Sequence, residues 1–308
     1  AGLGKSFGLA GWTLVYVLIS QLGYLVTVNV ATSAAVRSAQ DGLTTGVGFT
    51  PFTSAYYIML LPYSIVTISI VTALLPHLSK LAMENKVEDV RLQLIRAIRM
   101  CGVVTVPSAV ALLAFGPLIT EVLFFGISLE DSRYIGYVLS ALSLGLVAFS
   151  INLILIRGFN AFEDTKTQVV SIFIINLISV GLSYLFLEIL PSDLVTVGLG
   201  VAFSVSYILG LFITIYLLRK HTARIDFSAV RSQHLRLLIA SLIAMAPFYL
   251  LAWRLDWVNT EFETIKSLAH LLVVLGGGGS LFLLLANLFK VSEVNSAKSY
   301  LRSRLLKR

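Results

Sequence analysis

The chain has 308 residues, of which 57% are hydrophobic and only 13% are charged, and its formal net charge is +7. Soluble domains carry about 25% charged residues, so this composition, with a mean hydropathy of +0.90, excludes an ordinary soluble fold. We expect an all-α polytopic membrane protein whose basic excess orients the helices and contacts anionic lipids, with no role in binding nucleic acid.

Eight hydrophobic segments are long enough to cross a bilayer as helices, which takes about 18–20 apolar residues. Helices are the expected form because lipid leaves the edges of open sheets and irregular loops without hydrogen-bond partners. The predicted spans are 10–36, 51–76, 101–125, 134–158, 168–190, 195–218, 237–253 and 268–289.

Polar side chains gather in the first predicted span, which contains Gln21, Thr27 and Asn29. Hydrogen bonds between helices explain most polar residues inside membranes, and lining of a polar cavity is the alternative. We select Gln21 and Asn29 as candidates for a substrate cavity. No span centre carries Asp, Glu, Lys or Arg, so the sequence shows no proton relay or charged ion site.

The stretch 80–99 mixes charges with regularly spaced apolar residues, among them Val90, Leu94 and Ile98. This pattern predicts an amphipathic helix at the membrane surface that leads into the third span, with partner binding as the alternative. The single cysteine, Cys101, is interpreted as a small buried side chain. Without clustered Cys or His residues, the sequence predicts no metal site and no cofactor.

The fourth and fifth spans are joined by "RGFNAFEDTKT", residues 157–167, which holds four charged residues, namely Arg157, Glu163, Asp164 and Lys166. The long side chain of Arg157 can reach lipid headgroups. Asp164 or Thr165 can cap the helix that follows. We consider two interpretations, a structural hinge belonging to an inner gate and a direct contact with a substrate headgroup.

Nineteen of the 23 Lys and Arg residues lie in the connections that share a side with both ends of the chain. The positive-inside rule therefore predicts that both ends are cytoplasmic. The chain begins with Ala1 and not with Met, and we expect it to be part of a longer protein.

Several stretches resemble one family, the MurJ/MviN lipid II flippases. The resemblance is carried by "SFGLAGWTLVYVLISQLGYLVTVNVATSA" (6–34), "LPYSIVTISIVTALLPHLSKLA" (61–82), "VPSAVALLAFGPLITEVLFFG" (106–126) and "RGFNAFEDTKT" (157–167). It extends through most of 5–220 and more weakly to the end. The wording of the 157–167 stretch is most similar to actinobacterial members.

The resemblance implies a MATE-like fold of two six-helix lobes followed by two further helices. Residues 1–220 would be the second lobe, and 221–308 would be a cytoplasmic loop, two C-terminal helices and a basic tail. The function implied is that of a transporter and not of an enzyme. Its partners would be lipid II, an undecaprenyl-diphosphate-linked precursor, and a missing N-terminal lobe, in the bacterial plasma membrane.

The sequence departs from this family at positions tied to charge. Family members have an arginine five residues before the proline that matches Pro62. This chain has Tyr57 at that position. Tyr56 and Tyr57 are further cavity candidates, because their hydroxyls can bind a sugar or phosphate, and simple packing is the alternative. Members also place an acid near Thr27, and its absence argues against sodium coupling there.

Two other functions stay open. One is another MATE-like transporter, either a polysaccharide-lipid flippase or a drug/cation antiporter, although an antiporter normally needs an ionisable coupling residue. The other is a non-transporting scaffold that recruits wall-synthesis or division proteins through its basic face, including 219–236 and the tail 298–308.

Overall fold

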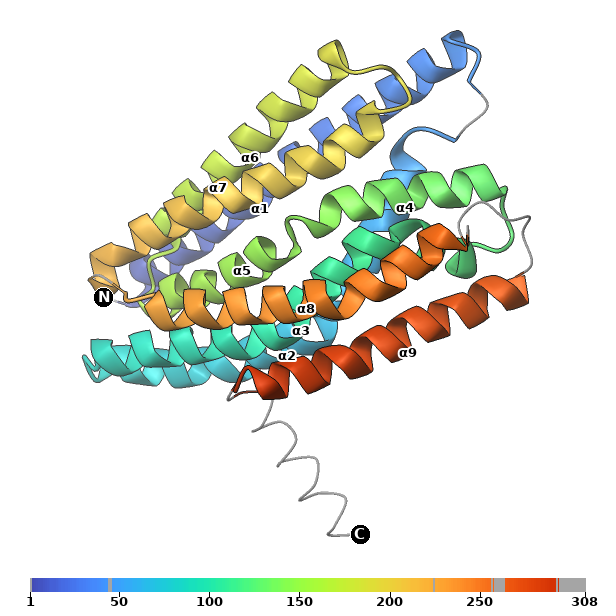
Figure 1. The fold of residues 1–308 in the computed structure, drawn as a ribbon. Helices are drawn as coiled ribbons and strands as arrows, with labels where there is room; N and C mark the ends of the chain where they lie inside the picture. The colour runs from blue at the N-terminus through green and yellow to red at the C-terminus, as the bar shows by residue number, and fades with distance from the viewer. Residues whose placement is uncertain are drawn as a thin grey trace.

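The computed structural model describes residues 2–43, 46–223, 225–255, 257, 264–291 and 293, and this part of the chain is helical throughout, with connecting turns and no strands (Figure 1). The basic tail 298–308 lies outside the described residues. The helices are α1 (Gly2–Gln40), α2 (Phe49–Met83), α3 (Val87–Leu123), α4 (Leu129–Ser143), α5 (Leu146–Ala161), α6 (Thr165–Ile189), α7 (Val195–Thr222), α8 (Ser228–Arg254) and α9 (Thr264–Leu288).

Six of these helices are long and apolar enough to cross a membrane, and there are eight crossings if each of two bent pairs counts as one. One pair is the two halves of α2, Phe49–Ile65 and Thr67–Met83, which meet at 48°. The other is α4 with α5, which meet at 50°. The prediction of a polytopic all-α membrane protein is confirmed.

The fourth predicted span, 134–158, is wrong as a single helix because the chain breaks between α4 and α5. The carbonyl of Ala141 loses its helical hydrogen-bond partner at the break. The hydroxyl of Ser204 in α7 donates to this carbonyl instead, at 2.7 Å. A Cβ added to Gly145 would lie 2.7 Å from the Cα of Ser204. Close packing of α7 against this glycine therefore accompanies the bend.

The predicted amphipathic helix over 80–99 does lead into the third span, but it begins at Val87 and its apolar face packs inside the protein and not on the membrane surface. Residues 80–83 end α2, a tight turn follows in which Asn85 has a φ of 55°, and 87–99 form the first part of α3. Val90, Leu94 and Ile98 are buried in a core cluster shared with α2 and α5. The apolar face thus packs inside the protein because α2 and α5 extend alongside it.

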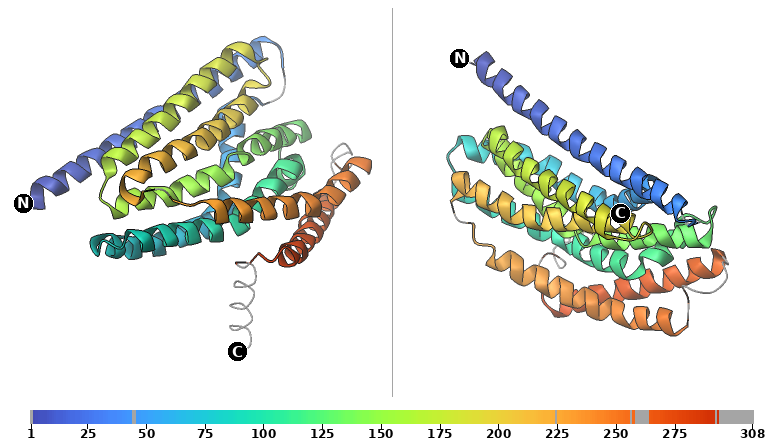
Figure 2. Two further views of the ribbon diagram at one scale, coloured as in Figure 1. Left: turned by 60° about the vertical axis from the view of Figure 1, so that its left-hand side comes forward. Right: turned by 90° about the horizontal axis from the view of Figure 1, so that it is seen from above.

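The helices form two groups that lie side by side (Figure 1). α6 packs against both α1 and α7 in one group, whereas α2, α3, α4 and α5 form the other, with α7 contacting both. α8 and α9 pack against each other and against α3, at the edge of the second group (Figure 2).

The first helix packs along α6, and only its C-terminal part is buried in the core. Val30, Ala31 and Ala34 are buried in the core with side chains of α2. Most residues nearer the start of α1 are exposed, including large apolar side chains such as Leu14 and Leu18. Figure 2 shows α1 running beside α6 while its N-terminal end lies away from α2. One long face of α1 therefore has no partner within the described part of the chain.

Candidate functional site

A cavity of about 190 Å³ lies where α1, α2, α6 and α7 meet. Its wall includes a cluster of aromatic rings. The ring of Phe203 lies 5.8 Å from Tyr56 and 4.7 Å from Tyr207, measured between centroids. The lining residues are Gly23, Tyr24, Thr27, Phe52, Thr53, Tyr56, Tyr57, Ile175, Asn176, Ser179, Phe203, Ser206 and Tyr207.

The polar groups in this cavity are all neutral. Thr27 and Asn176 donate to carbonyls within their own helices, at 3.2 Å to Gly23 and 2.9 Å to Ile172. None of the lining side chains is a carboxylate, Lys or Arg. Nor do three His, Cys, Asp or Glu side chains come together as metal ligands would, among the described residues. The polar part of the cavity wall therefore consists of hydroxyl and amide groups.

Two of the four predicted cavity residues line this cavity and two do not. Tyr56 is half-buried and stacks on Phe52 with a centroid distance of 6.4 Å, so its ring has a packing role. Tyr57 is 65% exposed. Gln21 and Asn29 lie on the exposed part of α1, outside the cavity. Their predicted contact with a substrate is not tested by this placement.

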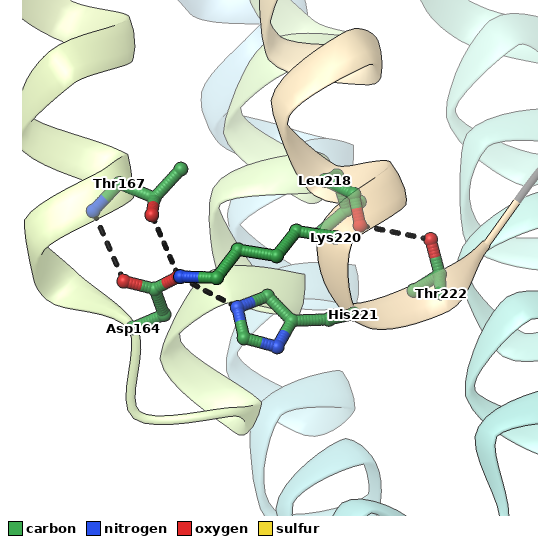
Figure 3. Close-up of polar contacts among 6 residues, drawn as sticks. All are labelled: Asp164, Thr167, Leu218, Lys220, His221 and Thr222. Atoms are coloured by element: carbon green, nitrogen blue, oxygen red, sulfur yellow. Dashed lines mark hydrogen bonds and ion pairs between the residues drawn. The ribbon is translucent and has the colours of Figure 1, made fainter.

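The prediction of a loop over 157–167 is wrong for most of the stretch, because 157–161 end α5 and 165–167 begin α6, and only 162–164 form the turn. Asp164 is the N-cap of α6. One carboxylate oxygen accepts from the Thr167 backbone N–H at 3.1 Å, and the other accepts from the Thr167 hydroxyl at 2.7 Å (Figure 3). Of the two caps considered, Asp164 or Thr165, the structure has the first. The cap forms because the carboxylate reaches backbone N–H groups that the first turn leaves unpaired.

The same carboxylate reaches the end of α7. His221 Nε2 lies 2.6 Å from Asp164 Oδ2, and Lys220 Nζ lies 3.4 Å from it (Figure 3). Phe162 stacks on the imidazole at 4.9 Å. Burial alone would raise the pKa of Asp164, but hydrogen bonds from Thr167, His221 and Lys220 outweigh it and hold that pKa well below its usual range.

The role of His221 could not be predicted from the sequence, because this histidine lies 57 residues beyond Asp164 and the local spacing carries no signal of their contact. The cap itself has a local signal, since Asp164 and Thr167 are three residues apart.

The four charged residues of the loop do not form one site. The ammonium of Lys166 lies 5.8 Å from the centroid of the Trp12 ring in α1. Glu163 has a left-handed backbone with φ 55° at the turn. Arg157 belongs to α5, and its buried Nε has no hydrogen-bond partner among the described residues.

The opposite ends of the helices are joined by polar contacts between loops. Ser192 donates to Asp41 at 2.5 Å and thereby links the α6–α7 turn to the end of α1. The backbone N–H of Gly46 donates to Asp131 of α4 at 2.6 Å.

Two further contacts strengthen this end of the molecule. The buried carboxylate of Glu121 pairs with Arg133 at 2.6 Å and joins α3 to α4. Arg37 donates to the carbonyl of Leu187 and joins α1 to α6. These contacts fix the helices at the end remote from the 157–167 loop, whereas α1 and α2 are spread apart at the other end.

A model of the family described as "Lipid II flippase MurJ" matches residues 1–268. A "Probable lipid II flippase MurJ" from Rhizobium meliloti (strain 1021) is 29% identical over 262 residues, which are 84% of this chain and 45% of that protein. Another from Rhizobium tropici is 26% identical over 196 residues, 63% of this chain and 36% of that protein.

A solved structure of lipid II flippase MurJ in an inward closed conformation has the same fold, with a TM-score of 0.66 and 21% identity. The match covers 89% of this chain and 52% of that one. The chain therefore spans about half the length of these proteins, or less. Because the family model covers most of the sequence, this chain belongs to the MurJ lipid II flippase family.

Proposed function

We propose that this chain is the second lobe and the last two helices of a flippase that moves lipid II from the inner to the outer leaflet of the bacterial plasma membrane. In this proposal 1–220 form the lobe, and 221–308 supply a loop, two helices and a tail. Two observations support this proposal. The chain spans about half the length of its relatives, and one long face of α1 has no partner among the described residues.

We place the missing N-terminal lobe opposite the exposed faces of α1 and α2. A diphosphate-linked headgroup cannot cross hydrocarbon alone, because removing its charges from water costs many kcal/mol. A polar passage between two lobes avoids that cost, while the polyprenyl tail stays in lipid. Gln21 and Asn29 on α1 and Tyr57 on α2 then face the passage, and their amides and hydroxyl hydrogen-bond the headgroup.

Both ends of the chain are cytoplasmic in this proposal, as the distribution of Lys and Arg predicts. The spread ends of α1 and α2 then lie on the cytoplasmic side, where substrate enters. Arg157 lies at that end with a buried nitrogen that no described residue satisfies. We assign it to the inner gate or to a diphosphate contact, since a guanidinium pairs well with phosphate oxygens.

Alternating access then uses α1 as the moving element. Its C-terminal third is fixed in the core, and its N-terminal part contacts mainly α6. Glu163, Asp164 and Lys166 belong to the hinge of the inner gate. Asp164 holds the loop to α7, and Lys166 contacts Trp12 of α1.

Replacement of Tyr57 tests the proposed passage. Full-length protein carrying Tyr57→Ala should fail to restore growth after depletion of the wild type, because the passage loses a hydrogen-bonding group. The control is Tyr216→Ala on α7, since Tyr216 is 68% exposed against 65% for Tyr57 and does not line the cavity. Equal complementation by both variants, at equal abundance in the membrane, would remove Tyr57 from the passage.

A further inference from the structure

A second hollow lies far from the tyrosine-lined cavity, at the end of the molecule that carries the basic loops. It has a volume of about 220 Å³ and is formed by α3, the start of α8 and the segment after α9. This volume is several times the roughly 30 Å³ that one water molecule occupies. The side chains that matter are Arg99, Gln233, Arg236, Lys290 and Glu293.

The wall of the hollow is fixed by Arg99 and its neighbours. Arg99 Nε donates to Gln233 Oε1 at 2.8 Å, and Gln233 Nε2 donates to the Arg99 carbonyl at 3.1 Å. Arg99 Nη2 also pairs with Glu293 Oε1 at 2.7 Å. These contacts join α3, α8 and the segment after α9, so the hollow is preorganised. Glu293 compensates the charge of Arg99.

Two further cations remain at the rim. Arg236 follows Gln233 by three residues on α8, and Lys290 comes two residues after the end of α9. Both are exposed, and neither forms an ion pair with another described residue. Within the described part of the chain, the hollow therefore presents two cations without ion pairs beside a wall fixed by hydrogen bonds and an ion pair.

Exposed leucines lie close in the sequence to the residues that line the hollow. Leu235, Leu238 and Leu242 are exposed along α8, at the spacing of one helix face. Leu284 and Leu288 are exposed on the last turns of α9. A soluble anion would make no favourable contact with these leucines, whereas the acyl chains of a lipid bound by its headgroup would lie along them. Basic pockets between membrane helices on the cytoplasmic side bind anionic headgroups.

We propose that this hollow binds the phosphodiester headgroup of an anionic phospholipid from the inner leaflet. Arg236 and Lys290 contact the phosphate, and Arg99 and Gln233 form the wall. The assignment to the inner leaflet rests on the proposed function, in which both ends of the chain are cytoplasmic. The rest of the inference does not depend on that orientation. The contact would hold α8 and α9 against α3 in the membrane.

Lipid binding to the purified full-length protein tests the site, with phosphatidylglycerol and phosphatidylcholine as probes in detergent and native mass spectrometry as the readout. The double variant Arg236→Gln with Lys290→Gln should weaken binding of phosphatidylglycerol roughly tenfold and leave phosphatidylcholine unchanged. The control is Lys80→Gln with Arg231→Gln, which removes the same two charges from exposed positions outside the hollow. It should change the affinity less than about twofold.

The proposed site would be overturned if both double variants weakened phosphatidylglycerol binding equally. It would also be overturned if Arg236→Gln with Lys290→Gln left both the binding and the unfolding temperature unchanged. Inorganic phosphate, added at the same concentration as the lipid, should not displace it. Displacement of the lipid by inorganic phosphate would show that the hollow recognises the phosphate group alone. That result would overturn the assignment to a lipid. Lipid II is absent from this assay, so a protein that fails to flip lipid II would still give a clear result.

Discussion

Asp164 joins three parts of the chain at the scale of a single residue. Its carboxylate caps α6 and binds the end of α7 through His221 and Lys220, while its backbone N–H donates to the carbonyl of Phe159 at 3.0 Å and closes the turn after α5. The cap was predictable from local sequence, because donor and acceptor are three residues apart. The ion pair with the end of α7 was not predictable from local sequence, because only folding brings α7 close to Asp164.

Replacing Asp164 separates these roles. Asp164→Ala removes both the cap and the ion pair and should lower the free energy of unfolding by about 1–2 kcal/mol. Asp164→Asn keeps an oxygen that can cap the helix and should recover part of that loss. Thermal unfolding of the purified variants in detergent measures both effects. Identical loss in the two variants would mean that the cap contributes nothing.

The depressed pKa of Asp164 sets the direction of its dependence on pH. A carboxyl group whose pKa falls on folding stabilises the fold fully above its unfolded pKa of about 3.9. That contribution is lost as the pH falls below this value toward the folded pKa. The stability difference between wild type and Asp164→Asn should therefore shrink below about pH 4. A difference that grew as the solution became more acidic would contradict the ion pair.

At the scale of elements, the break between α4 and α5 shows what hydropathy does and does not predict. The apolar run 134–158 predicts a span, because its length and composition are local properties. The bend depends on Ser204, which lies some sixty residues later and approaches Gly145 only in the fold. In the same way, the exposure of Gln21 and Asn29 is decided by how α1 packs on α6, which no spacing in α1 specifies.

Substitution of Gly145 tests this break. Gly145→Ala places a methyl group against the α7 backbone and should destabilise the protein by roughly 1–3 kcal/mol. Gly181→Ala in α6 is the matched control, because no atom lies within 4 Å of its added Cβ, and it should be neutral or slightly stabilising. Equal unfolding temperatures for the two variants would show that α7 shifts to accommodate the methyl group. The close approach of α7 to Gly145 would then contribute nothing to stability.

At the scale of the whole molecule, the described helices form one packed bundle in which α1 packs mainly along α6 and leaves its other face exposed. Polar contacts join the helix ends remote from the 157–167 loop, while α1 and α2 separate at the other end. The family, the number of spans and the helical class were all accessible from sequence, because they follow from apolar runs and short motifs. The predicted actinobacterial affinity, the orientation of the ends and the cavity roles of single residues stay predictions.

The leaflet position of lipid II during depletion of the full-length protein tests the central claim most directly. Intact cells are treated with a reagent or enzyme that reaches only lipid II exposed on the outer face, and the protected fraction is measured. The proposed function predicts that protected, inner-leaflet lipid II accumulates on depletion and that re-expression of the protein reverses the change. An unchanged distribution of lipid II, with mislocalised division or wall-synthesis proteins, would contradict it and favour a scaffold.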